Sequence, residues 1–367
     1  MISNSKKILF VTPFTPDNQG AGVSYTSQLL KELAKTCEID LVYFRYENNK
    51  EYVVPDSNIT VIREEVIDTG DKIRALLLQP GVFPLFTARF NKGVCSFLQE
   101  QVVNTRYDFV YFDFSQTFSY AKYINHPHKI LMAHDVIAQK YSRMKKYLRP
   151  WAKFTERKML KYGNMVFTFS EKDCKLIEQL YGVEALPTTF FLNENVINAT
   201  PDKESDYFVF FGSWGRIENS EALEWFVDYV HEPLSTQIKF KIIGGNLPEG
   251  LKAKISKTPN MEYLGFVEDP YPIIANARAE IAPLHMGAGV KVKCVEALGC
   301  GTPIIGTEVA FEGIDDKYRS AMFEANTAVE YVKVITSFKY SLEEKKQLKE
   351  FFLENYNNKQ ILKYING

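Results

Sequence analysis

The sequence lacks three features that would each mark a special class of protein: paired cysteines, a long apolar run and a net charge of one sign. Its scattered cysteines, none of them in a CxxC pair, are Cys37, Cys95, Cys174, Cys294 and Cys300. This pattern argues against a zinc site and indicates reduced thiols in the cytoplasm. No apolar run approaches the roughly 18 residues of a membrane span. The run Ile8–Val11 is too short for a signal peptide and predicts a buried first strand.

Charge balance and histidine spacing exclude two further classes. The formal net charge of the 367 residues is −1, so the chain as a whole has no attraction to nucleic acid or to an anionic membrane. The five histidines show no metal-ligand spacing: His126, His128, His134, His231 and His285. We therefore expect no metal site, and a globular chain whose length suggests about two domains.

Short apolar runs alternate with helical periodicity in both halves of the chain, which is typical of parallel α/β units. Strands are predicted first at Lys7–Val11, Ile39–Phe44, Ile59–Ile62, Phe109–Phe112, Lys129–Ala133 and Met165–Phe169, and later at Tyr207–Phe211, Lys239–Ile243, Met261–Leu264, Glu280–Pro283 and Ile304–Gly306. The polar stretch Asn193–Asp206 separates the two series, which predicts one domain over residues 1–198 and another over 204–349. Because parallel sheets bind ligands at the carboxyl ends of their strands, we expect the site in a cleft between the domains.

The most informative segment is Pro283–Ile314, in which a glycine loop leads into a helical run. Gly287 and Gly289 precede two lysines, Lys291 and Lys293, and Glu296 follows one turn later. Free backbone N–H groups, the helix dipole and two ammonium groups form an anion site, and a single acid beyond them suits hydroxyl groups. This combination predicts a site for a nucleotide diphosphate-sugar. The alternative is a surface ion pair between Lys293 and Glu296, which share one helix face.

Two loops of the first half are further candidates. Gly20 and Gly22 lie at the start of the helix after the first strand, where backbone N–H groups can approach a phosphate or an acceptor; the alternative is a plain turn. His134 and Asp135 directly follow the predicted strand Lys129–Ala133, a position suited to a base or a hydrogen-bond donor. A structural role for His134 stays open.

Residues 139–163 carry nine basic side chains against the single acid Glu156, with aromatic residues interleaved. Such a stretch can lie on an anionic membrane surface or hold a lipid-linked diphosphate. A solvated helix face is the alternative, and nucleic acid is disfavoured because no matching motif accompanies the charge. We expect a cytoplasmic protein with peripheral contact at the inner membrane face.

With these motifs the chain resembles a GT-B glycosyltransferase of the family-4 type. The block Phe208–Trp225, with its strand, Gly-Ser turn and helix, resembles the start of that family's donor domain. Residues 262–293 resemble the following segment, and Gly289–Glu296 followed by Gly301-Thr302-Pro303 resembles the donor motif of one subgroup. In the first half, HDVIAQKYSRM and FTFSEKD resemble its acceptor domain.

The resemblance implies two Rossmann-like domains with parallel sheets facing a central cleft, and a last helix, 350–367, that packs back on the first domain. It implies transfer of a sugar from a UDP- or GDP-sugar to a glycan or lipid-linked acceptor, with retention and without an obligatory metal. The residues implied in catalysis are His134, Lys291, Lys293 and Glu296. The donor-binding set is Gly20, Gly22, Gly212, Ser213, Phe266, Val267, His285, Gly287, Ala288, Gly289, Lys291, Lys293 and Glu296.

Two positions depart from the family's pattern. Many members carry a second Glu eight residues before the one that matches Glu296, where it meets the donor sugar, and this chain has Ala288 there. Many also carry an Arg where Ser213 stands. A GT-B sugar-nucleotide epimerase and a non-catalytic scaffold are the alternative functions. Incubation of a nucleotide-sugar without acceptor separates the epimerase from the transferase.

Overall fold

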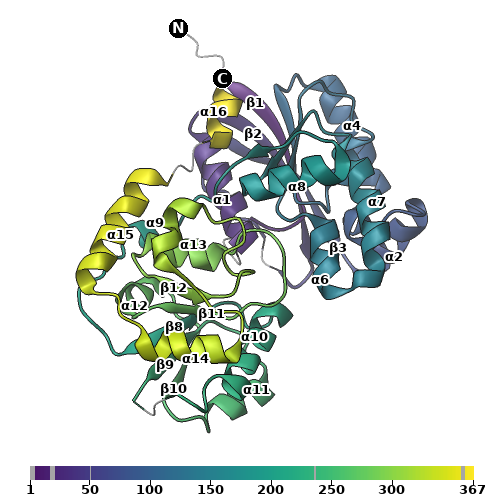
Figure 1. The fold of residues 1–367 in the computed structure, drawn as a ribbon. Coiled ribbons are helices and arrows are strands. Elements are labelled where there is room, and N and C mark those ends of the chain that lie inside the picture. The colour runs from purple at the N-terminus through teal and green to yellow at the C-terminus, as the bar shows by residue number, and fades with distance from the viewer. Residues whose placement is uncertain (1–4, 17–20, 50, 235–236, 357–359) are drawn as a thin grey trace. The chain divides into compact units, whose positions relative to one another are not determined.

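The computed structural model describes residues 5–16, 21–49, 51–234, 237–356 and 360–367. These residues form two compact units, each an α/β structure with its own parallel sheet (Figure 1). The first unit contains the chain up to Phe191 together with the last helix. The second begins at Leu192 and includes residues up to Tyr356. The change of unit therefore precedes the polar stretch Asn193–Asp206, in which α9 (Glu194–Asn198) is a single short helix.

The sheet of the first unit has seven parallel strands in the order β3-β2-β1-β4-β5-β6-β7. The strands are β1 (Lys6–Thr12), β2 (Cys37–Tyr46), β3 (Ile59–Ile67), β4 (Phe109–Asp113), β5 (Lys129–Ala133), β6 (Met165–Thr168) and β7 (Leu186–Pro187). Along β1, Leu9 and Val11 enter one core while Ile8 and Phe10 are buried on the opposite face. Both faces are covered by helices, which is why these strands read as continuous apolar runs.

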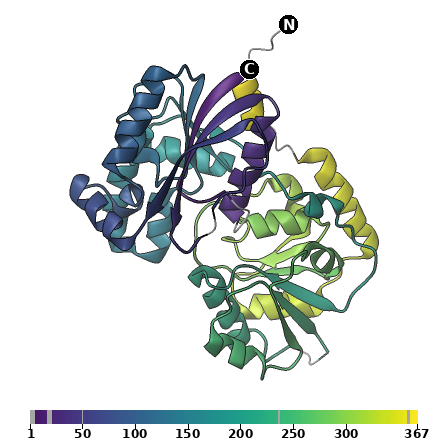
Figure 2. The same ribbon diagram turned by 180° about the vertical axis from the view of Figure 1, so that it is seen from behind.

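Helices cover both faces of this sheet, and Figure 2 shows the unit from behind. They are α1 (Ala21–Ala34), α2 (Thr69–Leu78), α3 (Pro84–Thr87), α4 (Lys92–Asn104), α5 (Phe118–Ala121), α6 (Ile137–Met144), the 3₁₀ helix η1 (Lys146–Leu148), α7 (Arg149–Leu160), α8 (Glu171–Tyr181) and α16 (Gln360–Asn366). Ser170 caps α8, because its side chain accepts a hydrogen bond from the Asp173 backbone N–H at 3.1 Å.

The second unit has six parallel strands in the order β10-β9-β8-β11-β12-β13. They are β8 (Tyr207–Phe211), β9 (Lys239–Ile243), β10 (Met261–Gly265), β11 (Glu280–Ala282), β12 (Ile304–Gly306) and β13 (Met322–Glu324). The helices after α9 are α10 (Ile217–Tyr229), α11 (Glu249–Ile255), α12 (Tyr271–Asn276), α13 (Val292–Gly299), the 3₁₀ helix η2 (Asp316–Ala321), α14 (Ala328–Ser337) and α15 (Leu342–Asn355). One core lies on the α12–α13 side of the sheet, and the other on the α10–α14 side.

The C-terminal segment contains two helices. The resemblance implies a last helix over 350–367 that packs back on the first domain, whereas the described residues form α15 and α16. The backbone leaves the helical region at Tyr356 (φ −81°, ψ 110°), whose ring stacks on Phe352 at 4.7 Å. Helix α15 belongs to the second unit and only α16 to the first, where Tyr364 meets the Phe109 and Phe167 rings. No helix in the described ranges is long and apolar enough to cross a membrane.

Candidate nucleotide-sugar site

The predicted glycine loop connects β11 with α13 at the carboxyl edge of the second sheet. Gly287 (φ +104°) and Gly289 (φ +67°) both adopt left-handed backbone angles that favour glycine. Helix α13 begins at Val292, so Lys291 is the residue before its first turn. The Lys291 side chain makes no capping hydrogen bond to the start of α13.

Lys293 lies beside the Gly212–Ser213 turn that follows β8. Its Nζ donates to Asn219 Oδ1 at 3.3 Å, and Asn219 Nδ2 donates to the Ser213 carbonyl at 2.9 Å. A Cβ at Gly212 would lie 3.3 Å from Asn219 Nδ2, so glycine leaves room for this amide. The structure thus brings together Gly212, Ser213 and Lys293, all of which the sequence predicted. The amide that connects them, Asn219, was missed as a site residue, although it lies in the first turn of α10 within the matching block.

The carboxyl ends of β8, β9 and β10 are held close together by glycine. A Cβ at Gly244 (φ +128°) would lie 1.8 Å from the Gly212 carbonyl oxygen, so no other residue fits there. The Gly244 N–H donates to the Gly265 carbonyl at 2.8 Å. Directly after Gly265, Phe266 is 81% exposed, while Val267 packs against the core. This edge therefore presents an exposed aromatic ring and bare backbone at two positions of the predicted donor-binding set.

Glu296 lies on α13 one turn beyond Lys293 and receives a hydrogen bond. The Tyr271 hydroxyl donates to Glu296 Oε1 at 3.0 Å. Burial raises the pKa of Glu296 to about 7, although this hydrogen bond opposes the shift. The same burial and the Glu296 charge raise the pKa of Tyr271, which keeps its hydroxyl protonated as the donor. Glu296 therefore changes charge near neutral pH.

A second carboxyl group, Glu280, lies in the core at the start of β11. It is fully buried, and neither of its side-chain oxygens has a hydrogen-bond partner among the described residues. Burial raises its pKa to about 8, with the Lys293 charge acting in the opposite direction and the Glu296 charge in the same direction. Glu280 is therefore mainly protonated at neutral pH, so it adds little negative charge below the predicted anion site.

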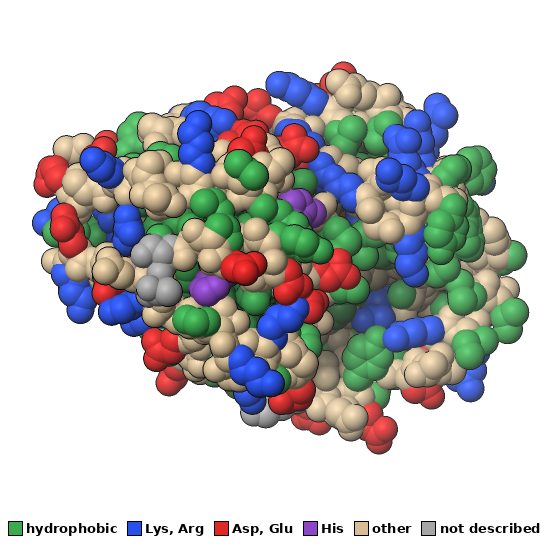
Figure 3. Space-filling view, turned by 60° about the horizontal axis from the view of Figure 1, so that its bottom comes forward, with side chains coloured by type: hydrophobic (Ala, Val, Ile, Leu, Met, Phe, Trp, Pro, Cys, Tyr) green, Lys and Arg blue, Asp and Glu red, His purple; other side chains and the backbone are tan. Residues whose placement is uncertain are grey.

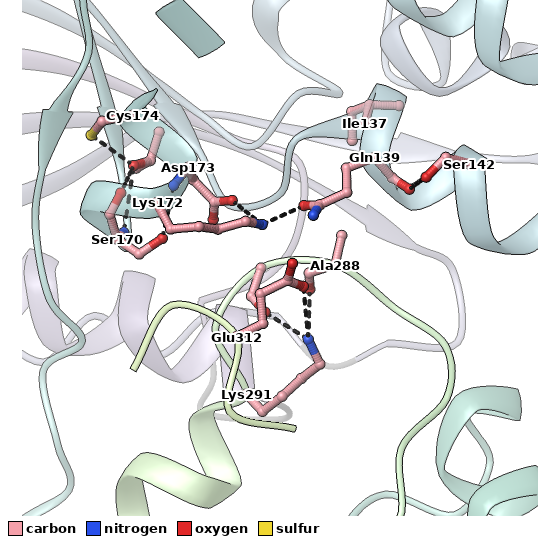
Figure 4. A network of polar contacts seen from close by, with 12 residues as sticks. Ile137, Gln139, Ser142, Ser170, Lys172, Asp173, Cys174, Ala288, Lys291 and Glu312 are labelled. Carbon is pink, nitrogen blue, oxygen red and sulfur yellow. Dashed lines mark hydrogen bonds and ion pairs between the residues drawn. The ribbon is translucent and has the colours of Figure 1, made fainter. Parts of the chain in front are cut away.

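Lys291 takes a different direction from Lys293. Its Nζ donates to the carbonyls of Gly289 (2.6 Å) and Ala288 (3.4 Å) and lies 4.0 Å from Glu312 Oε2 (Figure 4). The Lys291 and Glu312 side chains are 12% and 10% exposed. In this structure the ammonium group of Lys291 is held by its own loop, and only Lys293 lies beside the Gly212–Ser213 turn.

His285 is in the same loop but lies on the other side of the sheet. Its ring meets Trp225 of α10 edge-on at 4.7 Å, and Trp225 in turn contacts Tyr331 of α14. Tyr271, the partner of Glu296, belongs to the opposite core. Burial lowers the pKa of His285, which favours the neutral ring. The structure therefore does not group His285 with Tyr271 and Glu296.

In the first unit His134 is held at the end of β5. Its Nε2 donates to Asp113 Oδ1 at 2.8 Å, and its ring stacks on Phe114 at 3.5 Å with an interplanar angle of 10°. Phe114 has a φ of +58°, an uncommon value for a residue with a side chain. The rings of Tyr25 and Phe169 meet the imidazole edge-on. The sequence predicted a role for His134 but missed Asp113. Asp113 ends β4, which pairs in parallel with β5, so the two residues meet at the carboxyl edge of this sheet although 21 positions separate them.

Asp113 is fully buried and accepts two further hydrogen bonds. Thr26 Oγ1 donates at 2.6 Å and Thr12 Oγ1 at 3.1 Å. Asp135, which follows His134 in the sequence, instead pairs with Lys140 at 3.2 Å. Gly20 lies outside the described residues, and Gly22 lies in the first turn of α1. Within the described ranges, no cluster of His, Cys, Asp and Glu is arranged to hold a metal ion.

Comparisons with known proteins agree with this architecture. Residues 205–338, within the second unit, match the family model described as glycosyl transferases group 1. A curated relative from Klebsiella pneumoniae, an uncharacterized 44.6 kDa protein in the cps region, is 24% identical over 178 residues. That match covers 43% of this chain and 44% of the relative, so it spans less than half of either protein.

Solved structures resemble almost the whole chain. Sucrose-phosphate synthase from Thermosynechococcus elongatus has a TM-score of 0.75 at 13% identity, covering 98% of this chain and 97% of its own. WaaG, a glycosyltransferase involved in lipopolysaccharide biosynthesis, has a TM-score of 0.67 at 14% identity over 97% and 98%. HepE from Anabaena, in complex with UDP and glucose, has a TM-score of 0.65 at 13% identity over 98% and 99%. The chain has the GT-B fold, as the resemblance of its sequence implies, and its residues 205–338 match the glycosyl transferases group 1 model.

Proposed function

We propose that the chain is a retaining, metal-independent glycosyltransferase that moves a sugar from a UDP- or GDP-sugar to a glycan or lipid-linked acceptor. The observation that carries this proposal is the joining of Lys293 to the Gly212–Ser213 turn through Asn219. Lys293 and Glu296 lie one turn apart on α13, so a cation and an acid are offered at one edge of the sheet. That arrangement suits a diphosphate and the hydroxyl groups of a ribose.

Each residue of this edge has a role in the proposal. Lys293 neutralises the diphosphate as the leaving group gains charge, which favours the transition state over the bound donor. Glu296 accepts hydrogen bonds from the ribose hydroxyls. The backbone at Phe266 and Val267 contacts the base, and the exposed Phe266 ring can stack on it. In the first unit, His134 contacts the donor sugar or the leaving phosphate.

The related proteins support a role in surface polysaccharide or glycoconjugate synthesis. HepE is seen with UDP and glucose, and another structural relative, from E. coli, is bound with UDP-2-fluoro glucose. WaaG acts in lipopolysaccharide biosynthesis, and the Klebsiella relative is encoded in a cps region. These similarities favour UDP as the nucleotide and a saccharide as the acceptor.

The experiment combines binding with product analysis. A thermal-shift series with UDP, GDP and their common sugar conjugates identifies the donor, since a ligand at 100 times its Kd stabilises by about 2.7 kcal/mol. Incubation of that donor with oligosaccharide and lipid-linked acceptors, with and without EDTA, then tests transfer and metal independence. NMR of the anomeric proton in the product distinguishes retention from inversion. Absence of any nucleotide binding by the folded protein would sink the proposal.

The same assay separates the two alternatives. A sugar-nucleotide epimerase converts the donor into a new sugar-nucleotide without acceptor, whereas a transferase gives only slow hydrolysis. A non-catalytic scaffold binds no nucleoside diphosphate. The joined Lys293, Asn219 and Ser213 favour a nucleotide-binding protein over the scaffold, because the fold alone does not require a lysine at that turn.

Peripheral contact with an anionic membrane is part of the proposal, and the structure enlarges the surface expected to make it. Residues 139–163 form α6, η1 and α7, and their one acid, Glu156, is buried. Its carboxylate accepts hydrogen bonds from the backbone N–H groups of Ile137 (2.8 Å) and Ala138 (2.9 Å), which satisfies two donors in the first turn of α6. The exposed face of this segment is left with basic and aromatic side chains.

Helix α2 adds exposed apolar residues to this surface. Trp151 of α7 donates its indole N–H to the Gly81 carbonyl at 2.9 Å and meets the Phe83 ring, which connects α7 to the chain that follows α2. The exposed apolar members are Ile73, Leu76, Leu77, Tyr147, Trp151 and Phe154, and the basic members are Lys145, Lys146, Arg149, Arg157 and Lys158. We name these eleven residues the basic–aromatic surface. Figure 3 shows basic and apolar side chains interleaved on the right, where α2, α6 and α7 lie in Figure 1.

The composition of this surface favours contact with a lipid bilayer over full exposure to water. Leu77 and Tyr147 are 76% and 77% exposed, which is uncommon for large side chains grouped on one face of a monomer. Aromatic rings fit the headgroup level of a membrane, and each nearby basic residue contributes about 1 kcal/mol of attraction to an anionic leaflet. Because the net charge of the chain is −1, the attraction must come from this face.

A further inference from the structure

We propose that Glu312 binds the hydroxyl groups of the donor sugar and supplies the carboxylate that position 288 lacks. The inference rests on the proposed function, since it assigns a sugar contact within the same site. It starts from two neighbouring strands. β11 and β12 pair in parallel, with Ala282 opposite Gly306, so the loops that follow them leave the sheet at the same edge.

The two loops are fastened to each other at their base. Thr307, the first residue after β12, donates its hydroxyl to the Leu284 carbonyl in the loop after β11. Its backbone N–H also donates to the Ala282 carbonyl at 3.4 Å. Because Thr307 is buried, the position of the second loop relative to the first is fixed where both begin.

Glu312 stands at the top of a short, packed turn. The Ala310 N–H donates to the Thr307 carbonyl at 3.0 Å, and the Ile314 N–H donates to the Phe311 carbonyl at 3.1 Å. Ala310 and Phe311 are buried in the core, which anchors the turn from below. Gly313 has a φ of +78°, so the chain reverses directly after Glu312. The carboxylate is therefore carried by a rigid support.

This support brings the carboxylate to the loop where the family pattern has its missing acid. Glu312 Oε2 lies 4.0 Å from Lys291 Nζ, and the same ammonium group donates to the carbonyls of Ala288 and Gly289 (Figure 4). Lys291 thus joins the acid of one loop to the backbone of the other. A Cβ at Gly287 would lie 3.6 Å from Lys291 Cε, so the lysine stem crosses directly over the glycine loop.

The chemistry of this pair suits a sugar. A carboxylate accepts hydrogen bonds from two neighbouring hydroxyl groups, and it cannot donate. The adjacent ammonium fixes the orientation of the acid. Since both side chains are largely buried, a hydrogen bond to the carboxylate is stronger than it would be in water. Glu312 is also acidic, so it favours a neutral sugar with free hydroxyls over one that carries a carboxylate or phosphate at the contacted position.

A purely structural role makes a different prediction. If Glu312 only neutralised Lys291, its replacement would lower thermal stability, and it would affect UDP and a UDP-sugar to the same degree. If it binds the sugar, affinity for UDP stays the same while affinity for the UDP-sugar falls. The ratio of the two affinities therefore separates the roles even when the variant is less stable.

The test compares Glu312→Gln with Glu308→Gln, a matched loss of charge at an exposed position of the same loop. Calorimetry with UDP, GDP, UDP-glucose and GDP-mannose first establishes the nucleotide and a sugar conjugate bound by the unmodified protein. Loss of a charge-assisted hydrogen bond contributes roughly 1.5–3 kcal/mol, or about tenfold to a hundredfold in Kd. Glu312→Gln should lower affinity for the sugar conjugate by that factor and affinity for the nucleotide by less than about twofold. Glu308→Gln should change neither.

Donors that lack one hydroxyl identify the contact. In the unmodified protein, the deoxy donor that lacks the contacted hydroxyl binds more weakly than the parent sugar conjugate, whereas Glu312→Gln binds both equally. Equal losses for nucleotide and sugar conjugate, or no loss, would overturn the assignment of Glu312. Failure of the unmodified protein to bind any nucleotide would instead overturn the proposed function, and Glu312 with it.

Discussion

His134 donates a hydrogen bond from Nε2 to the buried carboxylate of Asp113 at 2.8 Å. Since the hydrogen bond occupies Nε2, it leaves Nδ1 as the ring nitrogen able to meet a substrate. Asp113 is fixed in turn by the hydroxyls of Thr12 and Thr26, and Phe114 covers one face of the imidazole. His134 is thereby held in one tautomer and one orientation at the carboxyl end of β5.

Replacement of Asp113 by Asn should lower transfer activity while leaving the fold and nucleotide binding in place. The amide no longer selects the tautomer with hydrogen on Nε2, and a misoriented catalytic group costs about a hundredfold in rate. We expect kcat/KM to fall by that order and the Kd for UDP to change little. Asp135→Asn, which removes a partly exposed ion pair with Lys140, is the control and should keep most activity. An unaltered pH–rate profile with unaltered kcat in Asp113→Asn would show that the pair is only structural.

Nucleotide binding should weaken as the pH falls through 7. Burial raises the pKa of Glu296 to about 7, so this carboxylate is protonated at a higher pH than usual and then loses acceptor capacity for ribose hydroxyls. If only the ionised form binds, affinity for UDP falls about tenfold between pH 8 and pH 6. The UDP phosphate also titrates near pH 6, which affects all variants equally. The difference in pH dependence between the unmodified protein and Glu296→Gln isolates the glutamate, and identical profiles would remove Glu296 from the site.

The two lysines should differ in their effect on the diphosphate. Lys293 lies beside the Gly212–Ser213 turn through Asn219, whereas the Lys291 ammonium is held by two carbonyls near Glu312. Lys293→Ala should therefore lower the affinity for UDP by about tenfold or more, which corresponds to the loss of one charge-assisted hydrogen bond, and leave the affinity for uridine unchanged. Lys291→Ala should lower the affinity for UDP by a smaller factor. Calorimetry with UDP and uridine measures both, and equal losses for the two ligands in Lys293→Ala would contradict a phosphate contact.

The sequence predicts the sheets well because their strands are buried on both faces and read as apolar runs. The pair Lys293 and Glu296 is also predictable, since three residues along a helix place side chains on one face. Asn219, Asp113 and Glu312 could not be found in this way, because each meets its partner through strand order rather than through spacing in the sequence. The strands β7 and β13, of two and three residues, were missed. The break at Tyr356 was missed because the helical pattern continues across it.

Stability should rise with pH between about 8 and 10.5 through Lys345. This residue of α15 is buried and donates to the carbonyls of Ala275 and Ala277 at the end of α12. Burial lowers its pKa to about 8 from 10.5. The folded state therefore binds fewer protons than the unfolded state between these values, and the free energy of unfolding increases with pH in that window. The full difference is about 3 kcal/mol.

Chemical denaturation of the unmodified protein and of Lys345→Met at several pH values measures the contribution of Lys345 to the free energy of unfolding, because other titrating groups affect both proteins alike. The difference in unfolding free energy should shift in favour of the lysine form as the pH rises. Lys346→Met, at the exposed neighbouring position, is the control and should show no such shift. A difference that stays constant from about pH 8 to 10.5 would show that the buried ammonium keeps its ordinary pKa.

The basic–aromatic surface should bind anionic vesicles in a salt-dependent way. Its lysines and arginines attract the headgroups from outside, while exposed rings such as Tyr147 and Phe154 enter at headgroup level. Replacement of Lys145, Lys146 and Arg149 by Ser should remove about 3 kcal/mol of attraction at low salt, which is roughly a hundredfold in the partition coefficient. Sedimentation with vesicles that contain phosphatidylglycerol measures this partition coefficient. Added salt should weaken vesicle binding by the unmodified protein.

Two controls separate this surface from general charge effects. A triple Ser variant at Lys257, Lys339 and Lys346, which are exposed on the second unit, changes the net charge by the same amount and should sediment like the unmodified protein. Leu77→Ser with Phe154→Ser removes the apolar contribution and should weaken binding even at high salt, where the charges are screened. If the unmodified protein ignores anionic vesicles at low salt, the surface has no role at a membrane. If both triple variants lose binding equally, the attraction is a property of net charge and not of these helices.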